Sequence, residues 1–134
     1  MRVGGLSALA AGLHTLDLSH TRLTTGQLQA IFTSIIEAND LKLRKLNLSW
    51  NDLSSVSASA VSQAAARLEE VALSYSRLTV SQIQEVLVVV SSSQEHIKLA
   101  RLDLQGNNIS TLSPRILSRA IIRLQADLCN IRVN

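Results

Sequence analysis

The sequence predicts an α/β fold built from repeated strand–helix units, and three observations carry this prediction. A motif of five defined positions recurs along the 134 residues. Apolar residues at helical spacing follow each copy of the motif. Leucine supplies 23 residues, whereas Trp, Tyr and Phe each occur once. A core of this composition is aliphatic and repetitive, and we expect residues 1–134 to form a single domain.

The motif reads Leu-x-x-Leu-x-Leu-x-x-(Asn/Thr/Ser)-x-(Leu/Ile), and its copies start near residues 13, 43, 68 and 99. The motif positions are occupied by Leu13, Leu16, Leu18, Thr21 and Leu23; Leu43, Leu46, Leu48, Asn51 and Leu53; Leu68, Val71, Leu73, Ser76 and Leu78; and Leu99, Leu102, Leu104, Asn107 and Ile109. The starts lie 30, 25 and 31 residues apart, so long and short units alternate. Arg22-Leu-Thr also recurs as Arg77-Leu-Thr. We expect partial units at both ends of the chain.

Each unit is predicted to contain one strand followed by one helix. The Leu-x-Leu centre of the motif alternates with period two, which is typical of a short strand with one face in the core. Helical spacing follows over 28–36 and 83–90 in the long units, and over 61–68 and 117–124 in the short units. Val88-Val-Val90 favours a strand by composition, but the equivalent segment of the first long unit lies in a clear helix. We therefore predict a helix there as well.

Helix start signals agree with these positions. Thr24-x-x-Gln27 and Thr79-x-x-Gln82 have the form of a capping box, in which the two side chains bond each other's backbone N–H groups. Ser113-Pro114 places a capping hydroxyl before a proline in the first helical turn.

The C-terminal unit leaves two registers open. A second period of 56 residues relates Leu43 to Leu99 and Leu68 to Leu124, and its continuation places Asp127 and Cys129 in the positions of Val71 and Leu73. A register that breaks this period fits the apolar positions better. It runs through Ile121, Leu124, Ala126, Cys129 and Ile131. In either case we expect an irregular last strand.

The motif resembles that of leucine-rich repeat proteins, and the long units with true helices resemble the ribonuclease-inhibitor-like subfamily, also found in the sensor domains of NOD-like receptors. The resemblance covers nearly the whole chain. It implies a horseshoe-shaped solenoid of about four full repeats, with parallel strands on the concave face and helices on the convex face. Stacked units would bury a continuous core that a single unit cannot form. Asn51 and Asn107 occupy the family's asparagine position, where the amide satisfies backbone groups of the turn, and Thr21 and Ser76 fill it in the other units.

Binding residues are expected at strand positions whose side chains do not enter the core. Neighbouring strands lie about 4.8 Å apart, so equivalent positions form columns. One column is ionic (Thr15, Lys45, Glu70 and Arg101), and another is aromatic (His20, Trp50, Tyr75 and Gly106). The predicted protein-binding residues are His20, Trp50, Tyr75, Asp17, Lys45, Glu70, Arg101 and Asp103.

Both columns also have a purely structural interpretation. The aromatic residues either anchor a partner or pack on one another over the turn that follows each strand. The charges either form a ladder of ion pairs or set partner specificity. Arg115, Arg119 and Arg123 form a basic stripe that we interpret as a solvated helix face.

The sequence gives little support to catalysis, and we expect no catalytic residue, cofactor or metal site. The three histidines show no metal-ligand spacing, and no glycine-rich phosphate loop is present. Cys129 is the single cysteine, so an internal disulfide is excluded, and we interpret it as a core thiol. A net charge of +3 is too mild to indicate nucleic acid, and no apolar run of about 18 residues indicates a membrane span.

The sequence therefore predicts a non-catalytic module that recognises a protein ligand through the concave face. The resemblance implies a place in innate immune or signalling recognition. It also leaves two alternatives: an accessory regulator of a GTPase or of actin assembly, and a fragment of a larger sensor that self-associates through its uncapped ends. Secreted relatives usually carry disulfide-bonded caps, which this chain cannot form, so we expect a cytoplasmic location.

Overall fold

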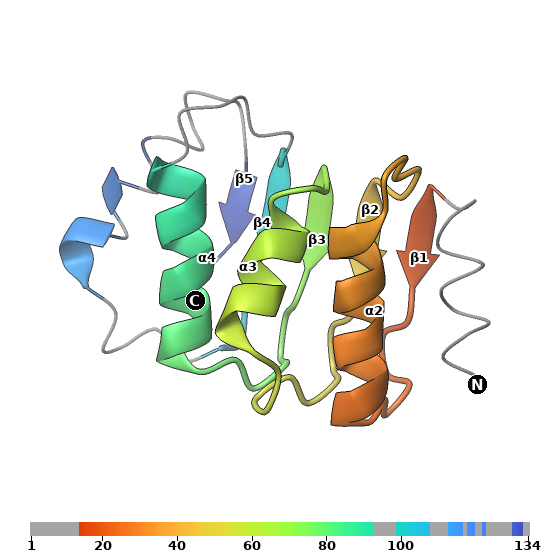
Figure 1. The fold of residues 1–134 in the computed structure, drawn as a ribbon. Coiled ribbons are helices and arrows are strands. Elements are labelled where there is room, and N and C mark those ends of the chain that lie inside the picture. The colour runs from red at the N-terminus through yellow and green to blue at the C-terminus, as the bar shows by residue number, and fades with distance from the viewer. Residues whose placement is uncertain are drawn as a thin grey trace.

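The computed structural model describes residues 14–92, 99–107, 113–116, 118–119, 122 and 130–132. Within them, one parallel sheet has the strand order β1-β2-β3-β4-β5. Its strands are β1 (Thr15–Asp17), β2 (Lys45–Asn47), β3 (Glu70–Ala72), β4 (Arg101–Asp103) and β5 (Asn130–Arg132). The helices between them are α2 (Thr25–Glu37), α3 (Ala58–Ala65) and α4 (Val80–Ser92). Figure 1 shows these helices as one layer against one face of the sheet; the opposite face is here called the open face.

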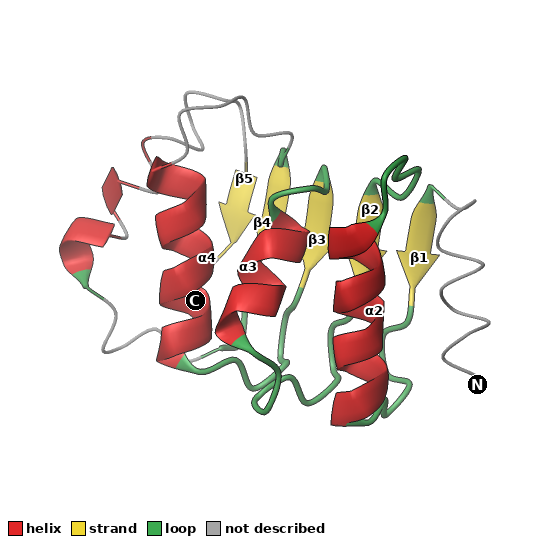
Figure 2. Cartoon of the chain, in the orientation of Figure 1, coloured by secondary structure: helices red, strands yellow, loops and turns green. Residues whose placement is uncertain are grey.

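The predicted alternation of strands and helices is confirmed (Figure 2). Helices α2 and α4 contain 13 residues each, and α3 between them contains 8, so the long and short units of the sequence differ in helix length. The valines at 88–90 lie within α4, as expected. Strand connections of this kind need a crossover, which the helices supply.

The core lies between the two layers and is built from the motif residues. The central residues of β1, β2, β3 and β4 are buried, and each stands in register with the next: Leu16, Leu46, Val71 and Leu102. The helices contribute one apolar stripe each, which includes Leu28, Phe32, Ile35, Val61, Ala64, Ile83 and Leu87. Each unit therefore buries its apolar face only by stacking on its neighbours.

Both predicted capping boxes are present. At α2, the Thr24 N–H donates to Gln27 Oε1 (2.9 Å) and the Gln27 N–H donates to Thr24 Oγ1 (3.1 Å). At α4, Thr79 and Gln82 make the same pair of bonds at 2.7 and 3.2 Å. The Gln82 side chain is buried and its Nε2 also donates to the carbonyls of Leu53 and Val56, at 2.7 Å each. Gln82 thus ties the start of α4 to the loop of the preceding unit.

A charged side chain bonds the carbonyl groups at the C-terminal end of α2. Arg67 Nη1 donates to the carbonyl oxygens of Ile35 (2.6 Å) and Ile36 (2.9 Å) in the last turn of that helix. A cation at this end also complements the helix dipole. Arg67 follows α3, so this contact joins two successive units.

The last strand follows neither expected register. β5 pairs with β4 so that Ile131 lies beside Leu102, whereas the two registers placed Asp127 or Leu124 in this column. The sequence contains the reason, because Leu128, Ile131 and Val133 repeat the Leu-x-x-Leu-x-Leu spacing. An apolar residue suits a strand position beside the buried Leu102, whereas an unpaired Asp127 carboxylate does not.

Several predicted features lie outside the described residues: the partial unit before residue 14, Arg123, Cys129 and most of the segment 117–124. Of the basic stripe, Arg115 and Arg119 are described, and both are exposed.

Candidate functional site

The turns that follow the strands are held by two buried asparagines. Asn51 Nδ2 donates to the carbonyls of Leu18 (2.9 Å) and Leu48 (3.1 Å), and its Oδ1 accepts the N–H of Leu23 (3.1 Å). Asn107 makes the equivalent bonds to Leu73 (2.8 Å), Leu104 (3.0 Å) and Leu78 (2.9 Å). Each amide therefore satisfies backbone groups of two successive units, which confirms the structural role predicted for both residues.

Thr21 and Ser76 occupy the same motif position and make fewer bonds. Thr21 Oγ1 donates to the Leu18 carbonyl at 2.6 Å. The Ser76 hydroxyl lies 3.1 Å from the Ser74 carbonyl and 3.4 Å from that of Leu48. A hydroxyl thus supplies part of the asparagine contacts, as expected.

Directly after each turn begins, the chain adopts a left-handed backbone conformation. The φ angles are 58° at His20, 64° at Trp50, 52° at Tyr75 and 79° at Gly106. Three of these residues are not glycine, and this region is unfavourable for them. Backbone bonds hold the conformation, because each N–H of His20, Trp50 and Tyr75 donates to a carbonyl of the following unit at 2.8–3.1 Å. The side chains at these equivalent positions therefore lie side by side on neighbouring loops.

Three of these side chains form a stack, here called the aromatic ladder: His20, Trp50 and Tyr75. The ring centroids of His20 and Trp50 lie 5.2 Å apart, and those of Trp50 and Tyr75 lie 4.5 Å apart. The Tyr75 ring rests on Gly106, where an added Cβ would overlap it. Even so, Trp50 is 51% exposed and Tyr75 is 42% exposed. The aromatic residues thus pack on one another and still present their ring edges to solvent.

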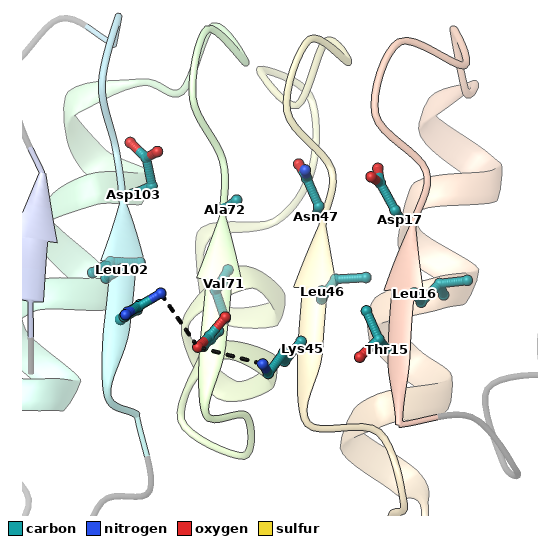
Figure 3. Close-up of a pocket in the computed structure, with 12 residues that line it drawn as sticks. Thr15, Leu16, Asp17, Lys45, Leu46, Asn47, Val71, Ala72, Leu102 and Asp103 are labelled. Atoms are coloured by element: carbon teal, nitrogen blue, oxygen red, sulfur yellow. Dashed lines mark ion pairs between the residues drawn. The ribbon is translucent and has the colours of Figure 1, made fainter.

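The ionic column forms a cross-strand ladder on the open face. Glu70 lies between Lys45 and Arg101, with its Oε1 3.7 Å from Lys45 Nζ and 3.8 Å from Arg101 Nη1 (Figure 3). Exposed pairs at such distances contribute little to stability. The column therefore places three charged side chains on the open face, and Thr15 on β1 is its last member.

A second row crosses the open face above this column: Asp17, Asn47, Ala72 and Asp103 (Figure 3). Asp17 accepts the N–H (3.0 Å) and the hydroxyl (2.7 Å) of Ser19, and these two bonds lower the pKa of its carboxyl. Asp103 accepts the N–H of Gln105 at 3.0 Å. Asp17 and Asp103, both predicted binding residues, therefore also shape the turns.

The two rows line a hollow of about 650 Å³, here called the open-face hollow. It brings together five of the predicted binding residues: Asp17, Lys45, Glu70, Arg101 and Asp103. Trp50 and Tyr75 do not line it. They border a second hollow of about 760 Å³ beside the loops, here called the loop-edge hollow. The predicted site thus consists of two neighbouring surfaces.

The loop-edge hollow contains residues that sequence reasoning did not assign to a site. Arg22 and Arg77 line it together with Asp52. The recurrence of Arg-Leu-Thr at 22 and 77 could have predicted that both arginines lie at this edge, because equivalent positions of stacked units share one edge of the fold.

Neither a metal-binding cluster nor a membrane-spanning helix is present in the described part of the chain. No group of three or more His, Cys, Asp and Glu side chains there is placed to hold a metal ion. None of the helices in that part is both long and apolar enough to cross a membrane.

A comparison with protein families gives a match at the level of the repeat. The family model described as Leucine Rich Repeat matches residues 42–64 and 98–120. These segments contain β2 and β4, together with the asparagines Asn51 and Asn107 that hold the turns. No curated protein matches the chain. The chain therefore contains two leucine-rich repeats by this criterion.

Proposed function

We propose that this leucine-rich repeat chain is a non-catalytic protein-binding module, which recognises a protein ligand through the open face and the aromatic ladder. Leucine-rich repeats generally mediate contacts between proteins, and the match at two repeats supports this class of function. One observation carries the proposal for this chain. Its single Trp and single Tyr are stacked at the loop edge of the fold and remain about half exposed.

Binding costs less conformational entropy when the contacting side chains are already ordered in the free protein. Trp50 and Tyr75 are fixed by their neighbours and by backbone bonds before any partner arrives. Rigid aromatic side chains lose little conformational entropy on binding and are frequent anchors of interfaces. The charges of Lys45, Glu70 and Arg101 would then select the partner by complementarity at the rim.

The finer assignments belong to the same proposal. We place the chain in the ribonuclease-inhibitor-like subfamily, as a horseshoe-shaped solenoid of about four full repeats, because long and short units alternate. We propose a cytoplasmic role in immune or signalling recognition, since the single cysteine cannot form disulfide-bonded caps.

Affinity capture from cell lysate, read by mass spectrometry, tests the proposal. Wild type is compared with Trp50→Asn/Tyr75→Asn, since Asn tolerates the left-handed conformation at both positions. Ile122→Asn is the matched control, because it removes a large apolar side chain that is 67% exposed elsewhere. We expect proteins that wild type and the control capture and that the double variant loses, with equal circular dichroism for all three. Identical captures by all three proteins would refute the role of the ladder.

A further inference from the structure

The loop-edge hollow carries two cations beside the aromatic ladder. Arg22 and Arg77 each stand two residues after a ladder residue, and both have left-handed backbone with φ angles of 52° and 55°. Their side chains are exposed. The loops that fix the ladder therefore also fix where these two side chains leave the backbone.

Neither cation is neutralised by a close ion pair within the described residues. Arg77 is 80% exposed in its side chain, and its Nη1 lies 3.9 Å from Asp52 Oδ2, a long separation for an ion pair. Arg22 makes no ion pair in this part of the chain. Among the described residues, Asp52 is the one acid of the hollow. Its Oδ1 accepts the N–H (3.0 Å) and hydroxyl (2.6 Å) of Ser54, so it remains a single carboxylate set against two arginines. The edge therefore has an excess of positive charge, which attracts anions.

The ladder limits which anions fit. Both faces of the Trp50 ring are covered, by His20 and by Tyr75, and the second face of Tyr75 rests on Gly106. Single-stranded nucleic acids bind proteins by stacking bases on free aromatic faces, which Trp50 and Tyr75 do not offer. Its exposed ring edges carry the positive part of the ring quadrupole. Ring edges of this kind suit apolar side chains and carboxylate or carbonyl oxygens, which peptides provide.

The spacing also fits an extended peptide. The units that carry Arg22 and Arg77 are two strand spacings apart, or about 10 Å. An extended chain covers this distance in about three residues. Two carboxylates of one short segment therefore reach both arginines while side chains between them contact Trp50 and Tyr75.

We propose that the loop-edge hollow binds an acidic, extended segment of the protein partner, with carboxylates on Arg22 and Arg77 and apolar side chains on the edges of Trp50 and Tyr75. This inference rests on the proposed binding function and names the chemical class of its partner.

The test uses a labelled peptide of about eight residues in which Glu and Leu alternate, long enough to span both arginines. Binding to the full chain is followed by fluorescence anisotropy, and the emission of Trp50, the single Trp, reports on the ladder. The same peptide with Lys in place of Glu and an oligothymidylate are the comparison probes. We expect saturable binding of the Glu peptide alone, weakened by added salt.

Variants locate the binding. Arg22→Gln/Arg77→Gln should weaken the Glu peptide by about fivefold or more, because two ion pairs are lost. Arg115→Gln/Arg119→Gln removes the same charge from exposed positions elsewhere and should leave the affinity unchanged. Three results would overturn the proposal: an equal loss of affinity in the two double variants, no saturable binding of the Glu peptide, or tighter binding of either comparison probe. If protein capture still depends on Trp50 and Tyr75 in that event, the binding module stands and only the acidic class of its partner is wrong.

Discussion

The indole of Trp50 lies on the phenol ring of Tyr75, with ring centroids 4.5 Å apart and planes inclined by 12°. Both residues hold a left-handed backbone that costs about 1–2 kcal/mol for a residue other than glycine. Backbone bonds between successive loops and the ring contact offset this cost. Because successive units are stacked, the aromatic side chains at equivalent loop positions are stacked as well and remain exposed.

Gly106 ends this stack, and a side chain there should disturb it. Gly106→Ala places a Cβ in the Tyr75 ring and a non-glycine residue at a φ of 79°, so the free energy of unfolding should fall by at least about 1–2 kcal/mol. Urea denaturation measures the change. Gly26→Ala is the control, because Gly26 lies in the first turn of α2, an added Cβ there meets only Thr24 Oγ1 at an ordinary contact distance of 4.0 Å, and Ala favours a helix. Equal effects of the two substitutions would contradict the close contact between Gly106 and Tyr75.

Asn107 should contribute far more to stability than an exposed asparagine. Asn107→Ala leaves the carbonyls of Leu73 and Leu104 and the N–H of Leu78 without their amide partner in a buried turn. We expect a loss of about 2–3 kcal/mol in the free energy of unfolding. Asn39→Ala, at an exposed position after α2, should change it by less than about 0.5 kcal/mol. Similar losses for both variants would show that the amide does not join the units.

Much of the fold can be predicted because its signals are local and periodic. The Leu-x-Leu centres mark the strands, and Thr24 and Thr79 mark the starts of α2 and α4 through their capping boxes. The long-range polar contacts carry no such signal. Neither the bond of Arg67 to the end of α2 nor the reach of Gln82 into the preceding unit follows from any spacing.

The site could be predicted in part for a similar reason. Columns of equivalent positions place Lys45 beside Glu70 and Trp50 beside Tyr75, because the repeat fixes the register. The contacts on both faces of the Trp50 ring depend on left-handed backbone at residues that rarely adopt it. The sequence does not predict this conformation. The same backbone feature brings Arg77 to the loop edge.

Hydrogen bonds from Ser19 to Asp17 predict a pH dependence of stability. They lower the pKa of Asp17 from its ordinary value of 3.8. Because the folded pKa lies below the unfolded value, the stabilisation is fully present above about pH 5 and is lost as pH falls through the folded pKa. The pKa of Asp52 is lowered in the same way by Ser54, so both carboxyls act in the same range.

Carbon-detected NMR titration checks this relationship. Ser19→Ala removes the hydroxyl bond, the largest cause of the shift, and should raise the Asp17 pKa toward its ordinary value. Asp52, whose partner is unchanged, serves as the internal control. An unchanged Asp17 pKa in this variant would contradict the hydrogen bond, and equal movement of Asp52 would point to a general change in the fold.

Glu70 separates two cations, and its removal should affect charge selection more than stability. Glu70→Gln leaves Lys45 and Arg101 facing one another across β3 without the acid between them. Because the three groups are solvent-exposed or half-exposed, the free energy of unfolding should fall by less than about 1 kcal/mol, and less still at high salt. Urea denaturation at low and high salt measures both values. Glu69→Gln is the matched control, since among the described residues Glu69 pairs only with Arg44, at 3.4 Å. A salt-independent loss well above 1 kcal/mol would show that Glu70 holds the strands together, and the open face would then have no charges free for a partner.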